Sequence, residues 1–173
     1  MLREKGMYII DTDLLARKAV EDKEVLEGLK KAFGEDIVSE NGLDRRLLAS
    51  RAFETEEKTA ILNSITHPKI TELTLEEVHK AESDGFKAAV IDAAVLFESP
   101  LTSVCDKIIC IVADKETRLN RIMARDNISE KDAIIRMNAQ RDEEYYISHS
   151  DIIIRNETAE DTRRQINEFT EVN

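Results

Sequence analysis

The stretch that decides the fold is MYIIDTD, residues 7–13, in which a short apolar segment ends in two aspartates. The apolar part predicts a buried strand, and the residues from Asp13 onward predict a helix. In open parallel sheets, ligands bind in the crevice outside the carboxyl ends of the strands. Asp11 and Asp13 are therefore candidates for chemistry on a phosphate or a hydroxyl group. The alternative is that Asp11 or its neighbour Thr12 only caps the helix, and both interpretations are open.

Further apolar segments rich in Ile and Val have the character of buried parallel strands. With the first, 7–11, they are 87–92, 107–112 and 151–155. Helical patterns fill the gaps at 13–33, 54–65, 69–83, 115–126, 130–140 and 159–169. Strands that alternate with helices predict an α/β fold in three layers, with a parallel sheet covered on both faces. We expect a single domain, 1–173, with a purely helical insertion at 40–83 that faces the substrate.

Composition excludes several classes of protein. The chain has 173 residues, of which 42% are hydrophobic and 35% charged, as in globular rather than disordered proteins. No apolar run approaches the roughly 20 residues that span a bilayer, and the N-terminus has no secretion signal. A cytoplasmic protein without a membrane partner is predicted. The net charge of −11 repels polyanions, so no nucleic-acid partner is expected.

Further acidic residues follow the second apolar segment. Asp92 ends 87–92 as Asp11 ends the first strand, and Glu98 comes after the apolar residues 95–97. Because parallel strands end at the same sheet edge, we expect these carboxylates to gather there with Asp13. Such a cluster requires cations or bound Mg²⁺.

Arginines gather after the third apolar segment. Arg118, Arg121 and Arg125 are neighbours on one helix by their i,i+3 and i,i+4 spacing. Arg136 lies in the next helical stretch. One interpretation is a solvated helix face with ordinary pairing to glutamates. The other is a lid, residues 114–150, that holds phosphate groups.

The segment THPKI, residues 66–70, contains a histidine directly before a proline. His67 is either a helix-end residue without a chemical role or a side chain that faces a ligand, with Pro68 expected at the start of the next helix.

Taken in order, these motifs resemble dephospho-CoA kinase. They are IDTDLLAR (10–17), THPKI (66–70), VIDAAVLFES (90–99), RLNRIMARDNIS (118–129), RMNAQ (136–140) and DIIIRN (151–156). The resemblance implies transfer of the γ-phosphoryl group of ATP to the 3′-hydroxyl of the ribose in dephospho-CoA. This reaction is the last step of coenzyme A synthesis, and its expected cofactors are ATP and Mg²⁺.

The resemblance also implies roles for individual residues. Asp13 is expected to orient and deprotonate the acceptor hydroxyl, with Asp11 supporting it, and Asp11 and Asp92 are the expected metal positions. The acceptor side is expected to include Arg17, His67, Phe97 and Glu98. The ATP side is expected to include Arg121, Arg125, Arg136 and Asn156.

The sequence departs from the family at the phosphate-binding loop. Kinases of this fold hold ATP with a loop of pattern G-x-x-x-x-G-K-[ST], which the 173 residues do not contain. In the family's expected strand order of 2-3-1-4-5, that loop follows the central first strand, so we expect this strand to be missing between 87–92 and 107–112. Residues 1–5 are then the last turn of the preceding helix, and Gly6 is its αL cap. Glu143 and Tyr146 replace residues that are basic in many members.

We therefore expect a truncated kinase whose catalysis is weak or absent, and self-association through exposed sheet edges. Two alternatives are a non-catalytic protein that binds CoA-like ligands and a nucleotide kinase for another acceptor. THPKI and the helical insertion favour a CoA-type acceptor over the second alternative.

Overall fold

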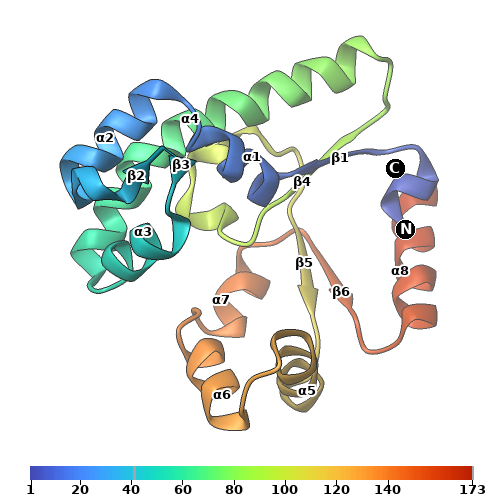
Figure 1. Cartoon of the computed structure of the whole chain (residues 1–173). Coiled ribbons are helices and arrows are strands. Elements are labelled where there is room, and N and C mark those ends of the chain that lie inside the picture. The colour runs from blue at the N-terminus through green and yellow to red at the C-terminus, as the bar shows by residue number, and fades with distance from the viewer. Residues whose placement is uncertain (41, 173) are drawn as a thin grey trace. The chain divides into compact units, whose positions relative to one another are not determined.

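The protein divides into two compact units, each described here by itself (Figure 1). The computed structural model describes residues 1–40 and 42–172. The N-terminal unit comprises residues 2–103, and the C-terminal unit comprises the residues from 104 onward together with Met1. None of the helices in the described part of the chain is both long enough and apolar enough to cross a bilayer.

The N-terminal unit is built on a parallel strand pair. Its elements are η1 (Leu2–Lys5), β1 (Tyr8–Asp11), α1 (Thr12–Ala19), α2 (Lys23–Phe33), η2 (Glu35–Ile37), β2 (Val38–Ser39), β3 (Gly42–Leu43), α3 (Arg45–Ala52), α4 (Glu56–Ser83), β4 (Ala89–Asp92), η3 (Leu96–Glu98) and η4 (Pro100–Val104). β1 pairs with β4 in parallel, in a register that runs from Tyr8–Ala89 to Asp11–Asp92. Gly6 between η1 and β1 has a φ of +80°, as expected for an αL cap.

The hydrophobic core of this unit is formed by side chains of α2, η2 and α3. Val25, Leu29 and Phe33 follow each other by four residues along α2, so they share the buried face of that helix. The other members of the cluster are Ile37, Leu48 and Ala52. Helix α4 packs closely on α2 at Gly28. A Cβ atom added at this glycine would lie only 3.1 Å from Cγ2 of Ile65, so a larger residue would not fit without a shift of Ile65.

Two predicted helix boundaries are wrong. The predicted helix 13–33 is divided into α1 and α2, because the Asp22 carboxylate accepts hydrogen bonds from the backbone N–H groups of Glu24 (2.9 Å) and Val25 (3.3 Å) and starts a new helix. The predicted helices 54–65 and 69–83 are one helix, α4, with Pro68 inside it.

The continuity of α4 has a physical reason. Pro68 supplies no N–H group to the carbonyl of Ser64, which weakens the helix locally. The buried hydroxyls of Thr66 and Thr74 donate to the carbonyls of Leu62 (2.9 Å) and Ile70 (2.7 Å), and packing against neighbouring elements holds the helix together.

The predicted purely helical insertion is also wrong at its start. β2 and β3 form a short antiparallel pair, with Ser39 opposite Gly42. Gly42 has a φ of +93°, a conformation that favours glycine. Position 41 of the predicted insertion lies outside the described residues.

The C-terminal unit is built on a second parallel strand pair. Its elements are β5 (Ile109–Val112), α5 (Lys115–Asp126), α6 (Glu130–Asn138), α7 (Glu143–Ser148), β6 (Ile152–Arg155) and α8 (Ala159–Val172). The register of β5 and β6 runs from Ile109–Ile152 to Val112–Arg155, which confirms the predicted parallel strands. Helix α7 was not predicted.

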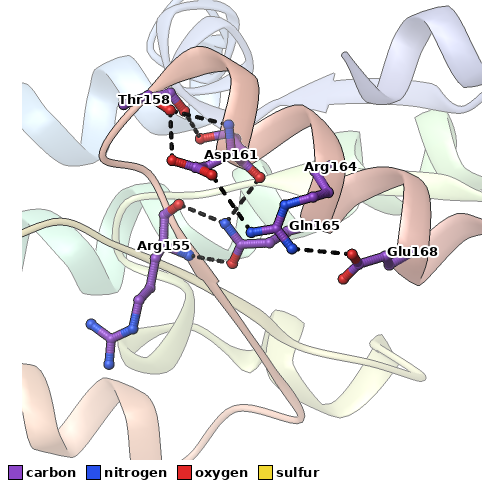
Figure 2. A network of polar contacts seen from close by, with 7 residues as sticks. Arg155, Thr158, Asp161, Arg164, Gln165 and Glu168 are labelled. Atoms are coloured by element: carbon purple, nitrogen blue, oxygen red, sulfur yellow. Dashed lines mark hydrogen bonds and ion pairs between the residues drawn. The ribbon is translucent and has the colours of Figure 1, made fainter.

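Two helices of this unit begin with a capping box. The hydroxyl of Ser129 accepts a hydrogen bond from the Asp132 N–H at 3.2 Å, at the start of α6. The hydroxyl of Thr158 accepts one from the Asp161 N–H at 3.1 Å, at the start of α8 (Figure 2). In both cases the hydroxyl also donates to the aspartate carboxylate, so each helix start is fixed by its own side chains.

The outer edge of β6 is closed by a side chain. The N–H of Arg155 donates to Oε1 of Gln165 at 2.9 Å, and Nε2 of Gln165 donates to the Arg155 carbonyl at 2.8 Å (Figure 2). The carboxamide thus replaces the neighbouring strand at this residue. Within the described residues, β5 pairs only with β6 and β4 only with β1, so each of these two strands has an unpaired edge. The central strand expected beside them stays a prediction.

The Gln165 carboxamide should contribute measurably to stability. We expect Gln165→Ala to lower the free energy of unfolding by about 1 to 2 kcal/mol, because the side chain loses three hydrogen bonds to the backbone, two to Arg155 and one to the Asp161 carbonyl. Chemical denaturation measures this change. Gln140→Ala, which removes an exposed glutamine, is the matched control and should change stability little. Equal effects of the two substitutions would contradict the edge-closing role of Gln165.

Candidate functional site

The carboxyl ends of β1 and β4 bring two aspartates together. Asp11 and Asp92 are neighbours in the strand register. Oδ1 of Asp11 accepts a hydrogen bond from the N–H of Leu14 at 3.0 Å, so Asp11 is the N-cap of α1. Thr12 is buried, and its hydroxyl donates to the Asp92 carbonyl at 2.9 Å. Asp11 therefore caps the helix, whereas Thr12 joins the start of α1 to the end of β4.

Asp13 is placed differently from Asp11. It lies exposed in the first turn of α1, and its carboxylate has no hydrogen bond or ion pair with any residue in the described ranges. Arg17 lies one turn further along the same face, and its guanidinium also has no such partner in the described chain. The Arg17 carbonyl accepts a hydrogen bond from Nη2 of Arg45 at 3.2 Å. Helix α1 thus presents one carboxylate and one guanidinium that are available to a ligand.

The predicted cluster of several carboxylates is not formed. Within residues 1–40 and 42–172, no group of three or more His, Cys, Asp or Glu side chains is arranged to hold a metal ion. The reason is that Asp11 turns toward Leu14, while Glu98 lies at a groove with His67. The adjacent pair Asp11 and Asp92 still fits Mg²⁺ in ligand type, since this ion usually takes one or two carboxylates together with substrate phosphates and water.

A groove lies along helix α4. It is open, has a volume of about 570 Å³, and is lined by Ala60, Asn63, Ser64, His67, Pro68, Thr71, Glu98 and Pro100. The structure thus brings the predicted residues His67 and Glu98 to one place. Phe97, in the same turn as Glu98, is half-buried and is not one of these lining residues in the described chain.

The electrostatics of the groove favour a neutral imidazole. Burial lowers the pKa of His67 below its ordinary value of 6.5, and the negative charge of Glu98 acts in the opposite direction. Because the lowering dominates, His67 is mainly uncharged at pH 7. The imidazole can then both donate and accept a hydrogen bond.

Arg121 and Asn156 come together in the C-terminal unit. The Arg121 guanidinium donates to the carbonyls of Asn156 (2.7 Å) and Glu157 (3.0 Å), so it fixes the loop between β6 and α8. Oδ1 of Asn156 accepts a hydrogen bond from the Thr162 hydroxyl at 3.1 Å. Arg121 therefore positions the loop that carries Asn156.

The other predicted lid arginines are paired with carboxylates. Nε of Arg125 lies 2.8 Å from Asp126, and Arg136 pairs with the same carboxylate. These contacts, that of Arg125 first, lower the pKa of Asp126. Arg118 pairs with Glu143 at 3.1 Å. A phosphate that binds Arg125 or Arg136 must therefore compete with Asp126.

Sequence inspection missed the capping residue of α5 and two groove residues. Hydrogen bonds from the Thr117 hydroxyl and N–H lower the pKa of Asp114 to about 2. The spacing of Asp114 and Thr117 is the signal that marks such a cap. Asn63 and Thr71 line the groove four residues before and after His67, and this helical spacing is the signal that identifies them.

The titration of His67 tests the electrostatics of the groove. We expect its midpoint, followed by NMR, to lie below 6.5, and Glu98→Gln to lower it further because the charge that favours the imidazolium is removed. Since the unfolded state then binds more protons, the free energy of unfolding should rise with pH just below 6.5. Glu76→Gln, on the same helix but outside the groove, is the control. A midpoint that rises in Glu98→Gln would refute this account.

The sequence of this chain is similar to those of dephospho-CoA kinases. The family profile described as dephospho-CoA kinase matches residues 1–161. The dephospho-CoA kinase of Corynebacterium efficiens is 39% identical over 158 residues, which cover 90% of this chain and 79% of that protein. The dephospho-CoA kinase of Listeria innocua is 35% identical over 174 residues, which cover 99% of this chain and 87% of that protein.

Two solved structures resemble this one. A crystal structure of a Thermus thermophilus protein has a TM-score of 0.84 and 27% identity, and the match covers 99% of this chain and 86% of that one. The dephospho-CoA kinase of Campylobacter jejuni has a TM-score of 0.70 and 28% identity, and the match covers 98% of this chain and 87% of that one.

Proposed function

The chain belongs to the dephospho-CoA kinase family, and from this premise we propose that its residues serve the transfer of the ATP γ-phosphoryl group to the ribose 3′-hydroxyl of dephospho-CoA. One observation carries the proposal for the site. Asp13 stands unpaired within the described chain at the carboxyl end of β1, one turn before Arg17. A carboxylate at the carboxyl edge of a parallel strand is in the place where such folds bind their ligands.

Asp13 is the residue that accepts the proton. Asp11 already uses a carboxylate oxygen to cap α1, whereas both oxygens of Asp13 are available. The acceptor hydroxyl donates a hydrogen bond to Asp13, which orients its oxygen toward the phosphorus atom and takes its proton as the new bond forms. Phosphoryl transfer depends mainly on such positioning and on charge stabilisation.

Asp11 and Asp92 would hold Mg²⁺ at the end of the strand pair, through the carboxylate oxygens that are not used for capping. When bound, the ion neutralises charge on the transferring phosphate. Arg17 contributes a fixed positive charge on the acceptor side, where dephospho-CoA carries a diphosphate.

On the ATP side, we assign Arg125 and Arg136 to contacts with the phosphate groups. When ATP binds, these contacts take the place of the ion pairs that both arginines form with Asp126. Asn156 is assigned to the adenine, and Arg121 holds the loop that carries it. The three arginines therefore have different roles in this proposal. Arg121 positions the protein backbone, whereas Arg125 and Arg136 bind the phosphates of the nucleotide.

The turnover of this 173-residue chain by itself should be weak. Its sequence contains no G-x-x-x-x-G-K-[ST] loop, whose backbone N–H groups and lysine would hold the phosphates. The same observation favours a second candidate function, in which the protein binds dephospho-CoA or a related ligand without phosphorylating it.

The role of Asp13 can be tested in a chain that is supplied with such a loop on an N-terminal extension. Asp13→Asn should lower kcat by roughly 10² to 10⁴ and change the acceptor KM much less, because the carboxylate acts in the transition state. A coupled assay of ADP release measures both. Glu24→Gln, in the first turn of α2, is the control and should leave kcat unchanged. An unaffected kcat in Asp13→Asn would reduce Asp13 to a charge at a helix start.

A further inference from the structure

The groove along α4 differs in chemistry from the rest of the acceptor side. No Lys or Arg lines it among the described residues, and its one charged side chain is the carboxylate of Glu98. A carboxylate repels phosphate groups, and a neutral His67 does not offset that repulsion. The groove is therefore unsuited to the diphosphate of dephospho-CoA, whereas Arg17 lies outside it on α1.

We propose that this groove binds the uncharged polyamide arm of the acceptor, and that Asn63 and Thr71 determine the specificity for that arm. The inference rests on the proposed function, because it concerns which part of dephospho-CoA the groove receives. The arm of dephospho-CoA is a flexible chain with two amides, a hydroxyl and a terminal thiol.

The polar groups of the groove form a single column. Asn63, His67 and Thr71 follow each other at intervals of four residues, so they lie on one face of α4, each separated by about one turn of 5.4 Å. Their carboxamide, imidazole and hydroxyl each donate and accept hydrogen bonds. An extended chain that carries amides at regular intervals can bond to successive members of this column.

Apolar groups and one backbone group complete the groove. Ala60, Pro68 and Pro100 supply contacts for the methylene and methyl groups of the arm. Pro68 gives no N–H to the carbonyl of Ser64, and both residues line the groove. That carbonyl is an acceptor that an amide N–H of the arm can reach.

The occupant of the groove can be identified by comparing three ligands. Calorimetry on the chain as it stands would use dephospho-CoA and ADP, and NMR titration would use pantetheine, which is the arm alone. The double variant Asn63→Ala, Thr71→Val should weaken dephospho-CoA binding roughly tenfold, since two hydrogen bonds are lost. It should also abolish the pantetheine shifts at His67 and leave ADP binding unchanged. Glu76→Ala, elsewhere on α4, is the control and should alter none of these.

The outcomes separate the inference from the proposed function. If the unaltered chain binds dephospho-CoA and the double variant binds it equally well, the groove assignment is wrong while the proposed function stands. If the double variant loses ADP binding to the same extent, the groove holds the nucleoside instead, which also overturns the inference. Failure of the unaltered chain to bind dephospho-CoA and pantetheine would overturn both. Asn63→Asp, which keeps the side-chain volume, and thermal melting of each variant distinguish a lost contact from misfolding.

Discussion

The parallel register of β1 and β4 is the constraint on which the candidate site depends. It places Asp11 beside Asp92, and the buried Thr12 hydroxyl fixes the start of α1 to the Asp92 carbonyl. Because Asp11 then caps α1, the next acidic residue, Asp13, lies exposed in the first turn with Arg17 one turn beyond it. A shift of the register by one residue would move these side chains to the opposite face of the sheet.

The start of β1 is fixed by contacts of Tyr8. The Tyr8 hydroxyl donates to Glu77 of α4, a contact that is the main cause of the raised pKa of Tyr8. The Tyr8 ring meets Phe86 edge to face with centroids 5.1 Å apart, and the Lys80 ammonium lies 5.9 Å from its centroid. Since α4 also carries the groove, the same strand positions both the proposed proton acceptor and the helix that is proposed to bind the acceptor arm.

The sequence predicts the strands well because buried parallel strands are continuous apolar runs, as at 107–112. Helix boundaries were less predictable. The break before α2 depends on the Asp22 cap, and the continuity of α4 through Pro68 depends on tertiary packing, which no local pattern records. At the candidate site, the sequence predicted which residue types are present, but not the hydrogen bonds and ion pairs that they form. Arg125 pairs with its sequence neighbour Asp126, but nothing local indicates that Arg136 pairs with the same carboxylate or that Arg121 binds backbone carbonyls.

The central claim is that the residues for the acceptor are present in this chain, whereas the loop that holds ATP phosphates is not in its sequence. Calorimetric titration of the 173-residue chain with dephospho-CoA and, separately, with ATP and Mg²⁺ tests this most directly. The account predicts clear binding of dephospho-CoA and much weaker binding of ATP, because Arg125 and Arg136 alone replace a cradle of backbone N–H groups poorly. Tight ATP binding accompanied by rapid phosphorylation of dephospho-CoA would contradict it.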